Sequence, residues 1–390
     1  MKKVCIVTGT RAEYGLLKPI IEKVYRADKL ELQLVVTGMH LSSEFGLTYQ
    51  EIEKDGYPIK AKIEMLLSSD TSVGITKSMG IALIGFADYY EINRPDIVVI
   101  LGDRYEILMA ASAAMIARIP IAHIHGGEKT EGAIDEAIRH SITKMSHLHF
   151  VTTEEYRNRV IQLGEQPDTV YNVGALGVEN IKSVKLLSKK ELEDSLGCQF
   201  TDNTVMVTFH PVTLESMTAD KQFRNILEVI DNHRELSVIF TKANADTDGR
   251  VINQMIDEYV AVNSDRCKVY ASLGQVRYLS ALRFCVAVVG NSSSGIIEVP
   301  SFGIPTVNIG DRQKGRVSAG SVVSCGNSVQ EIENALQTAL SRKFRDGLVN
   351  VKNPYEKAGT SDMVVQVISD ALEKKIDIKK KFYDIKLAGD

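Results

Sequence analysis

Five polar clusters in this chain have the composition needed to hold a phosphate group or to move a proton, and each follows an apolar, strand-like run. The clusters are Thr8–Arg11, Gly102–Arg104, His125–Glu128, His210–Pro211 and Gly290–Gly295. The runs before them are Val4–Val7, Ile97–Leu101, Ile121–Ile124, Val205–Phe209 and Val286–Val289. In open α/β sheets, ligands bind outside the carboxyl ends of the strands, where helix N-termini also point. The sequence therefore predicts an enzyme for a phosphorylated substrate.

The first two clusters offer an arginine and an acid. In Thr8–Gly15 a glycine lets the backbone approach a ligand, and the guanidinium of Arg11 can bind a phosphate through two hydrogen bonds. An ordinary loop with a surface arginine would have the same sequence pattern. Asp103 follows a fully apolar run, where a carboxylate serves as an acid or base or caps the next helix. His210 is a similar case, because a histidine at a strand end can be structural, hold a phosphate or shuttle a proton.

The segment Gly290–Glu298 is the stronger phosphate signal. Three consecutive serines between two glycines at a strand-to-helix junction offer several donors to a diphosphate, and Glu298 is placed to accept the hydroxyls of a ribose. A helix cap with a first-turn acid would explain one serine but not three. Asp311–Arg316 adds cations after the next strand.

The segment from His123 to His140 is the densest in titratable groups. Asp135 and Arg139 are spaced i, i+4 on a predicted helix, and so are Glu136 and His140. This spacing fits either a helix stabilised by salt bridges or a carboxylate base whose pKa is tuned by neighbouring cations. His123 and His125 are two residues apart on a predicted strand. This spacing matches no standard zinc site, and none of the five cysteines forms a C-x-x-C pair, so we expect no metal and no disulfide.

Composition places the chain among soluble globular proteins. Its 390 residues allow two domains, and 44% hydrophobic and 25% charged residues are ordinary values. A net charge of −4 does not indicate a nucleic-acid or membrane-surface partner, and no apolar run approaches the roughly 20 residues of a membrane span. The N-terminal apolar run is too short for a signal peptide, which predicts a cytoplasmic location.

Apolar strands alternate with segments of helical period, such as 76–92, 107–117 and 133–145, and a second series begins near Thr204. This pattern predicts an α/β fold of two Rossmann-like, doubly wound parallel-sheet domains with the active site in the cleft between them. We expect an N-terminal domain over 1–172, joined by a C-terminal helix over 365–385, and a nucleotide-binding domain over 173–364. The dinucleotide fingerprint G-x-G-x-x-G does not follow the first strand, which argues against a nicotinamide cofactor. The P-loop motif is absent as well.

Taken together, the motifs resemble those of the hydrolysing UDP-N-acetylglucosamine 2-epimerase family, whose members open sialic acid biosynthesis. The resemblance lies in GTRAEYG ending at Gly15, GDR at 102–104, HIHGGE and IDEAIRH within 123–140, FHP at 209–211, and GNSSSGIIEVPSFGIPTVNIGDRQKGR from Gly290. It implies a GT-B fold and a reaction without metal or redox cofactor. The implied chemistry removes the C2 proton of the sugar, expels the nucleotide diphosphate to give a glycal, and adds water.

The resemblance and the local patterns give two sets of site residues. The catalytic candidates are Asp103, Asp135, His125, Glu128, Glu136 and His210. The substrate-binding candidates are Arg11, Gly15, Arg104, Arg139, Asn244, Ser272, Ser292, Ser293, Glu298 and Arg312. One departure stands out: mammalian relatives and the non-hydrolysing epimerases carry a catalytic glutamate where this chain has His125, so the proton transfer there falls to His125, Glu128 or Glu131.

The expected reaction is conversion of UDP-N-acetylglucosamine to UDP and N-acetylmannosamine, by a homodimer or homotetramer. One alternative is the same reaction on a UDP- or GDP-linked 2,4-diacetamido-trideoxy sugar. The HIHGGE segment is similar to that of bacterial members, some of which act on such a sugar in legionaminic acid pathways. A second alternative is a GT-B glycosyltransferase. A non-catalytic nucleotide-sugar sensor would have no need of Asp103 and Asp135 beside a phosphate-binding His210.

Overall fold

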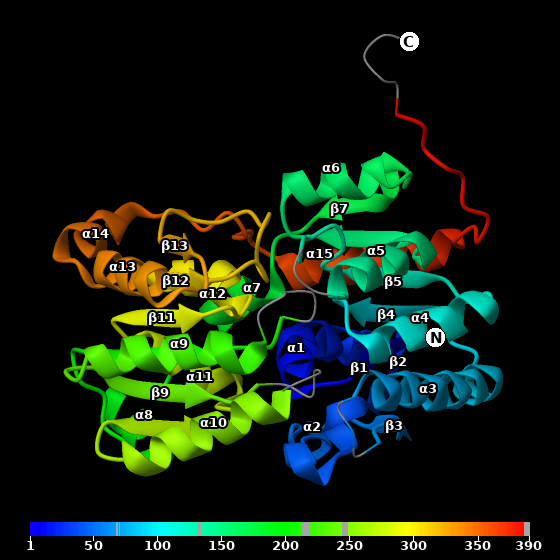
Figure 1. The fold of residues 1–390 in the computed structure, drawn as a ribbon. Helices are drawn as coiled ribbons and strands as arrows, with labels where there is room; N and C mark the ends of the chain where they lie inside the picture. Colours follow the sequence, from blue (N-terminus) through cyan, green and yellow to red (C-terminus); the bar gives the residue numbers. More distant parts are fainter. Residues whose placement is uncertain (68, 70, 131–133, 213–217, 244–248, 386–390) are drawn as a thin grey trace. The chain divides into compact units, whose positions relative to one another are not determined.

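The computed structural model describes residues 1–67, 69, 71–130, 134–212, 218–243 and 249–385. The chain forms two compact units, which Figure 1 shows in colours that follow the sequence. Unit 1 contains Met1–Glu128, Asp135–Asn180 and Tyr355–Asp390, and unit 2 contains Lys129–Ile134 and Ile181–Pro354. No helix among the described residues is long and apolar enough to cross a membrane.

Unit 1 is built on a parallel sheet of seven strands in the order β3-β2-β1-β4-β5-β6-β7. Its strands are β1 (Lys2–Thr8), β2 (Leu30–Thr37), β3 (Ile59–Ile63), β4 (Ile97–Leu101), β5 (Ile121–Ile124), β6 (Leu148–Val151) and β7 (Val170–Asn172). Its helices are α1 (Arg11–Arg26), α2 (Tyr49–Lys54), α3 (Ser72–Asn93), α4 (Tyr105–Ile116), α5 (Asp135–Met145), α6 (Glu154–Gln162) and α15 (Thr360–Lys374), and α7 (Leu176–Ser183) begins in this unit.

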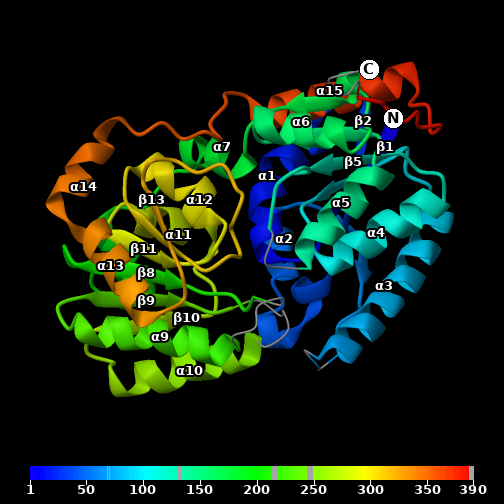
Figure 2. The ribbon, with the colours of Figure 1, turned by 45° about the horizontal axis from the view of Figure 1, so that its top comes forward.

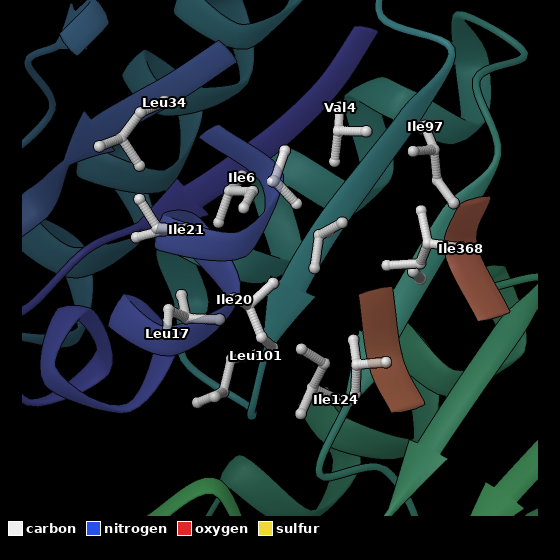
Figure 3. Close-up of a cluster of buried hydrophobic side chains, with 14 of the residues drawn as sticks. Val4, Ile6, Leu17, Ile20, Ile21, Leu34, Ile97, Leu101, Ile124 and Ile368 are labelled. Atoms are coloured by element: carbon white, nitrogen blue, oxygen red, sulfur yellow. The ribbon is translucent and has the colours of Figure 1, made fainter. Parts of the chain in front are cut away.

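The strands of unit 1 bury side chains on both faces, because helices cover both. On β1, Val4 and Ile6 face the core under α1 and α15, and Cys5 and Val7 face the core under α3 and α4. Figure 3 shows side chains of α1 and Ile368 of α15 in the first of these cores. Each fully buried aliphatic side chain of this kind contributes about 1.5–3 kcal/mol to folding.

Unit 2 repeats the same plan with six parallel strands in the order β10-β9-β8-β11-β12-β13. Its strands are β8 (Thr204–Thr208), β9 (Ser237–Thr241), β10 (Cys267–Tyr270), β11 (Ala287–Gly290), β12 (Thr306–Ile309) and β13 (Val322–Cys325). Its helices are α8 (Lys189–Leu196), α9 (Ala219–Asn232), α10 (Gly249–Val262), α11 (Gly274–Leu282), α12 (Ser294–Ile297), α13 (Val329–Leu340) and α14 (Arg342–Asp346).

Both sheets reverse their winding direction beside the first strand of the unit. In unit 1 the reversal lies between β1 and β4, and in unit 2 it lies between β8 and β11. Such switch points open a crevice at the carboxyl edge of the sheet, where ligands of doubly wound folds bind. The prediction of two Rossmann-like parallel sheets is confirmed, and the expected cleft between the domains stays a prediction.

The C-terminal segment differs from the helix expected over 365–385. The helix spans Thr360–Lys374, and Lys375 follows it with a φ of 64°, a left-handed conformation that ends the helix. The next residues run along unit 1, where Lys380 Nζ lies 2.7 Å from the buried carboxylate of Glu165 and the Tyr383 N–H donates to the Gly164 carbonyl at 2.9 Å. This segment is therefore bound to unit 1 through a buried charge.

The unit boundaries also differ from the division expected at residue 172. Val173 and Leu176 lie in the core of unit 1, and Val364 and Ile368 of α15 pack in the same cluster. Tyr355 reaches this unit too, because its hydroxyl lies 2.8 Å from that of Tyr156. Burial of these side chains, rather than the sequence pattern near Gly174, sets where unit 1 ends.

Candidate active site

Arg139 joins two acids at the carboxyl edge of the unit 1 sheet. Its Nη2 contacts Asp103 Oδ2, just after β4, and its Nη1 donates to Glu128 Oε2 at 3.2 Å. Arg139 lies on α5 and is only 2% exposed. A buried guanidinium is stable only when it is paired and hydrogen-bonded. These two ion pairs therefore hold helix α5 and the segments after β4 and β5 in fixed positions relative to one another.

His125 and Thr152 complete the surroundings of Glu128. Thr152 Oγ1 donates to Glu128 Oε1 at 3.1 Å, and His125 Nδ1 lies 3.8 Å from the same oxygen. The sequence placed His125 on a strand, but β5 ends at Ile124 and His125 has a φ of 65°. This left-handed conformation breaks the alternation of the strand. It brings the imidazole beside Glu128, where the two groups form an adjacent acid–base pair.

His123 anchors the residue that precedes Asp103. Its Nε2 lies 2.8 Å from the Gly102 carbonyl oxygen, which can only accept, so Nε2 carries the proton. Nδ1 then accepts from the Thr143 hydroxyl of α5 at 3.2 Å. Burial lowers the pKa of His123 to about 3, so the imidazole is neutral near neutral pH. The ring positions the backbone before Asp103 and does not carry protons.

The other two acids of this segment lie at the start of α5. Asp135 is its first residue, one turn before Arg139. Glu136 Oε1 lies 3.0 Å from His140 Nε2, so the expected i, i+4 pair is present. Residues 131–133, which include Glu131, lie outside the described residues.

The start of α1 is fixed by a capping box. Thr10 Oγ1 accepts from the Glu13 N–H at 3.2 Å, and Glu13 Oε2 accepts from the N–H groups of Gly9 and Thr10 at 2.6 and 3.2 Å. Arg11, the first residue of the helix, pairs with Glu51 of α2 at 2.7 Å. The Gly15 carbonyl accepts from Asn180 at 2.9 Å. Arg11 is thus held at the carboxyl end of β1 by a rigid helix terminus.

A second acid group lies beneath this turn. Glu106 is 1% exposed and accepts from Arg104 Nε at 2.7 Å, and a Cβ on Gly9 would approach Glu106 Oε1 to 2.6 Å. A side chain at position 9 would therefore displace the carboxylate of Glu106. Desolvation and the charge of Glu106 raise the pKa of Glu13 to about 8, against a lowering by Arg104. Glu13 consequently holds a proton near neutral pH.

In unit 2, Asn291 gathers the candidate phosphate-binding residues. Its Oδ1 accepts from the His210 N–H at 2.8 Å and its Nδ2 donates to the His210 carbonyl at 2.7 Å. Its own carbonyl accepts from Arg312 Nη1 at 3.0 Å and Gln313 Nε2 at 2.8 Å. Gly290 before it has a φ of 135°, and a Cβ there would overlap the Thr208 carbonyl oxygen. Only glycine allows β11 to approach β8 this closely.

The serines after Gly290 are not used as helix caps. Ser293 occupies the N-cap position of the four-residue α12 and makes no side-chain cap hydrogen bond, while the Ser294 hydroxyl lies 2.6 Å from that of Tyr278. Desolvation raises the pKa of Glu298, at the end of α12, and its hydrogen bond with Ser294 opposes this shift. Ser292 and Glu298 are half-buried. The helix-cap alternative for this segment does not hold for Ser293.

The structure brings the sequence-predicted residues into two groups. Asp103, His125, Glu128 and Arg139 form one network in unit 1, and His210 and Arg312 meet at Asn291 in unit 2. Other candidates have contacts of their own. Ser272, before α11, is exposed and accepts from the Gly274 N–H at 3.2 Å, and Asn244 lies outside the described residues.

Two positioning residues, His123 and Asn291, were missed as site residues by the sequence-based prediction. Asn291 stands inside the Gly-Asn-Ser motif, and a glycine followed by an amide at a strand end is the only local signal for it. His123 gave the weaker signal of a histidine within an apolar strand. Both side chains form hydrogen bonds with backbone groups of residues distant in sequence, and a local motif does not reveal such contacts.

Comparison with known proteins assigns the family. The model of the family described as UDP-N-acetylglucosamine 2-epimerase matches residues 22–369. This chain belongs to that family. A Campylobacter jejuni protein named GDP/UDP-N,N'-diacetylbacillosamine 2-epimerase (hydrolyzing) is 44% identical over 88% of the chain and 89% of the relative. The polysialic acid biosynthesis protein P7 of Escherichia coli is 39% identical over 99% and 98%.

Two further comparisons complete the family picture. The UDP-N,N'-diacetylbacillosamine 2-epimerase (hydrolyzing) of Legionella pneumophila is 33% identical, over 94% of this chain and 96% of its own. The crystal structure of UDP-GlcNAc 2-epimerase from Neisseria meningitidis bound to UDP-GlcNAc matches with a TM-score of 0.78 at 19% identity, over 94% of this chain and 100% of that one. The two Rossmann-like units are thus those of the epimerase GT-B fold.

Proposed function

We propose that this protein is a hydrolysing 2-epimerase of a UDP- or GDP-linked 2,4-diacetamido-trideoxy sugar. The support for this substrate comes from the two relatives named as hydrolysing N,N'-diacetylbacillosamine 2-epimerases, at 44% and 33% identity. The sequence-based prediction put UDP-N-acetylglucosamine first, and the relatives favour its alternative instead. A Neisseria meningitidis relative named UDP-N-acetylglucosamine 2-epimerase is 29% identical.

The structural observation that carries the proposal is the Asp103–Arg139–Glu128 network with His125 beside it. Epimerisation at C2 needs a base to remove the C2 proton and an acid to return one to the opposite face. Two carboxylates held by one buried arginine, together with an imidazole, supply groups for both tasks. His125 stands where the non-hydrolysing epimerases carry a glutamate, and its Nδ1 lies 3.8 Å from Glu128 Oε1. We assign the proton transfer at C2 to one of these two neighbouring groups.

The reaction proceeds in two steps. In the first, the base takes the C2 proton, the electrons of the C–H bond form a double bond between C1 and C2, and the C1–O bond breaks with its electrons leaving on the nucleotide diphosphate. In the second, water adds to the glycal: its hydroxyl goes to C1, and a proton goes to C2 from the face opposite to the one deprotonated. The products are a free sugar inverted at C2 and UDP or GDP.

Unit 2 supplies the nucleotide contacts in this proposal. His210 and Arg312, both tied to Asn291, stabilise the negative charge that develops on the departing diphosphate. Ser292 and Ser293 donate to its oxygens, and Glu298 accepts from the ribose hydroxyls. On unit 1, Arg11 and Arg104 lie at the carboxyl ends of β1 and β4 and contact the same substrate.

The test is NMR identification of products from four substrates: UDP and GDP, each linked to the diacetamido-trideoxy sugar or to N-acetylglucosamine. We expect nucleotide diphosphate and a C2-inverted diacetamido sugar, with kcat/KM at least ~10-fold above that for the N-acetylglucosamine compounds, because a site built for a second acetamido group loses that hydrogen bonding with the smaller sugar. A higher kcat/KM for UDP-N-acetylglucosamine would contradict the proposed substrate. Release of nucleotide only when an acceptor sugar is added would indicate the glycosyltransferase instead.

A second candidate rests on the Escherichia coli relative at 39% identity, which is named for polysialic acid biosynthesis. The activity we consider with it is the one first predicted from the sequence, release of N-acetylmannosamine from UDP-N-acetylglucosamine. The same four-substrate measurement separates the two, because both reactions invert C2 and differ only in the sugar turned over.

A further inference from the structure

The segment 375–385, which follows α15, runs along unit 1 without forming a helix or a strand. Figures 1 and 2 show it in red beyond the end of α15. The Tyr383 N–H donates to the Gly164 carbonyl at 2.9 Å, and the ring of Phe382 lies so close to Gly164 that a Cβ there would overlap it. Lys144 Nζ lies 5.0 Å from the centroid of the same ring. These contacts give the segment one defined path over α5 and the end of α6.

Lys380 of this segment contacts the C-terminal end of α5. Its Nζ donates to the Lys144 carbonyl at 2.7 Å, and the last four carbonyls of a helix have no partner within the helix. The same Nζ lies 2.7 Å from Glu165 Oε2, while Lys144 Nζ lies 2.5 Å from Glu165 Oε1. A cation at the C-terminus of a helix also compensates the negative end of the helix dipole. Lys380 therefore caps α5 from a distant part of the chain.

Glu165 makes this contact rigid, because its carboxylate is buried. Its side chain is 3% exposed, and that of Lys380 is 26% exposed. Desolvation raises the pKa of Glu165, but its hydrogen bonds with His149, Lys144 and Lys380 outweigh this effect and lower the pKa to about 2. The carboxylate is thus charged near neutral pH. Charged hydrogen bonds shielded from water are strong, and removing one partner leaves a buried charge less well compensated.

The end of α5 adjoins the side chains with which this helix reaches the candidate active site. Thr143, the residue before Lys144, donates its hydroxyl to His123 Nδ1 at 3.2 Å. His123 in turn holds the backbone before Asp103. Arg139, one turn earlier on the helix, contacts Asp103 itself. A displacement of α5 would therefore move both supports of Asp103 together.

We propose that Lys380 is a positioning residue for the reaction, which acts by holding α5, and with it Arg139 and Thr143, where Asp103 needs them. Lys380 has this effect through the helix and does not touch the substrate. Misplacing a catalytic group by about an ångström can slow a reaction by up to about 100-fold. The kinetic part of the inference rests on the proposed function, whereas the effect on α5 does not.

Steady-state kinetics of the full-length protein tests the effect on the reaction. Lys380→Met removes the ammonium group and keeps a side chain of similar length. We expect kcat to fall by roughly 10-fold, with KM changed by no more than about two-fold, because the proposed nucleotide contacts of unit 2 are untouched. Lys380→Arg keeps a cation that can donate to the Lys144 carbonyl, so it should recover most of kcat. Lys379→Met, which removes an exposed charge one residue earlier, should match the wild type.

Hydrogen exchange of α5 tests the inference without the reaction. In Lys380→Met, the amides of residues 139–145 should exchange roughly 5-fold faster than in the wild type, and the amides of α1, on the opposite face of the sheet, should be unchanged.

Unchanged kcat in Lys380→Met, an equal loss in Lys380→Arg, or wild-type exchange in α5 would each overturn the inference. Faster exchange throughout unit 1 would overturn it too, because it would show only a general loss of stability. A wild type that turns over no nucleotide sugar would contradict the proposed function instead, and the exchange of α5 alone would then decide whether Lys380 holds this helix.

Discussion

Asn291 holds both backbone polar groups of His210, accepting from its N–H at 2.8 Å and donating to its carbonyl at 2.7 Å. The two residues follow neighbouring strands, β8 and β11, on either side of the switch point of unit 2. Asn291 is fully buried, so these bonds are shielded from water. One side chain thus fixes the position of the backbone that carries the imidazole of His210.

Asn291→Ala should therefore weaken nucleotide binding through His210. It leaves two buried backbone groups without partners, a loss of about 1–3 kcal/mol, and frees the imidazole from its position. Calorimetry should show a dissociation constant for UDP or GDP raised by roughly 5- to 100-fold. Asn334→Ala, an exposed amide on α13, serves as the control. Unchanged affinity in the Asn291 variant would mean that His210 does not contact the diphosphate.

Asp103→Asn should fold normally and lose turnover by at least ~100-fold, the scale expected when a general acid or base is removed. The amide still accepts a hydrogen bond from Arg139 but cannot take a proton. Asp96→Asn is a matched control, because Asp96 precedes the opposite end of β4 and accepts from the Lys3 N–H at 2.8 Å. Near-normal steady-state turnover of the Asp103 variant, with an unchanged melting temperature, would leave this residue a structural role only.

His123 should behave as a residue that positions Asp103 through its hydrogen bond to the Gly102 carbonyl, and another N–H donor at position 123 should be able to replace it. His123→Ala frees the Gly102 carbonyl and should lower kcat by roughly 10- to 100-fold with little change in KM, because Asp103 is misplaced. His123→Gln keeps an N–H donor for that carbonyl and should recover most of kcat. Since burial lowers the pKa of His123 to about 3, the pH profile of the glutamine variant should match that of the wild type between about pH 5 and 8.

A control for this experiment is His149→Gln. His149 pairs with His123 in the register of β5 and β6, is equally buried, and contacts Glu165 at 3.0 Å instead of Gly102. The His149 variant should lose thermal stability without losing kcat. If both variants lower kcat alike, or if glutamine fails to rescue position 123, the hydrogen bond to Gly102 is not what matters.

The raised pKa of Glu13 predicts an unusual pH dependence of stability, in which the free energy of unfolding falls as the pH rises. Its pKa is raised from 4.5 to about 8 in the folded protein, so between these values the folded state binds more protons than the unfolded state. The free energy of unfolding must then fall as the pH rises from about 4.5 to about 8. Glu13→Gln keeps the acceptor for Gly9 but cannot titrate. Relative to the wild type, its free energy of unfolding should therefore rise with pH across this window.

Urea unfolding at several pH values measures this difference. Glu191→Gln is the matched control, because Glu191 occupies the same capping-box position on α8 but its exposed carboxyl has a lowered pKa through hydrogen bonds from Ser188. The difference between that variant and the wild type should be constant above about pH 5.5, where an ordinary glutamate is already ionised. A flat difference for Glu13→Gln as well would show that Glu13 is ionised in the folded protein.

Local pattern was enough to predict the two sheets and the strand ends that carry the site. β-branched runs followed by glycine and polar residues are short-range signals, and they located Asp103, His210 and Asn291-Ser292 at carboxyl ends of strands. The partners of Arg139 were not predictable in this way. Asp103 lies 36 residues before it, and only the packing of α5 on the sheet brings the two together.

The conformation of His125 also escaped prediction. Its φ of 65° depends on the end of β5 and on the hydrogen bond from its N–H to the Phe150 carbonyl at 2.8 Å, a residue on the next strand. Long-range contacts of this kind decide which atoms meet, whereas the residue types that the chemistry needs are already visible in the sequence.

The central claim is that the C2–H bond breaks and that its proton is exchanged with solvent. NMR of the free sugar formed in D2O from the UDP- or GDP-linked diacetamido-trideoxy sugar tests it directly. The account predicts a product with deuterium at C2 and inverted C2 configuration, because the glycal takes its new proton from water-exchanged groups near Asp103 and Glu128. A product that retains protium and its original configuration at C2, formed while nucleotide diphosphate is released, would contradict it.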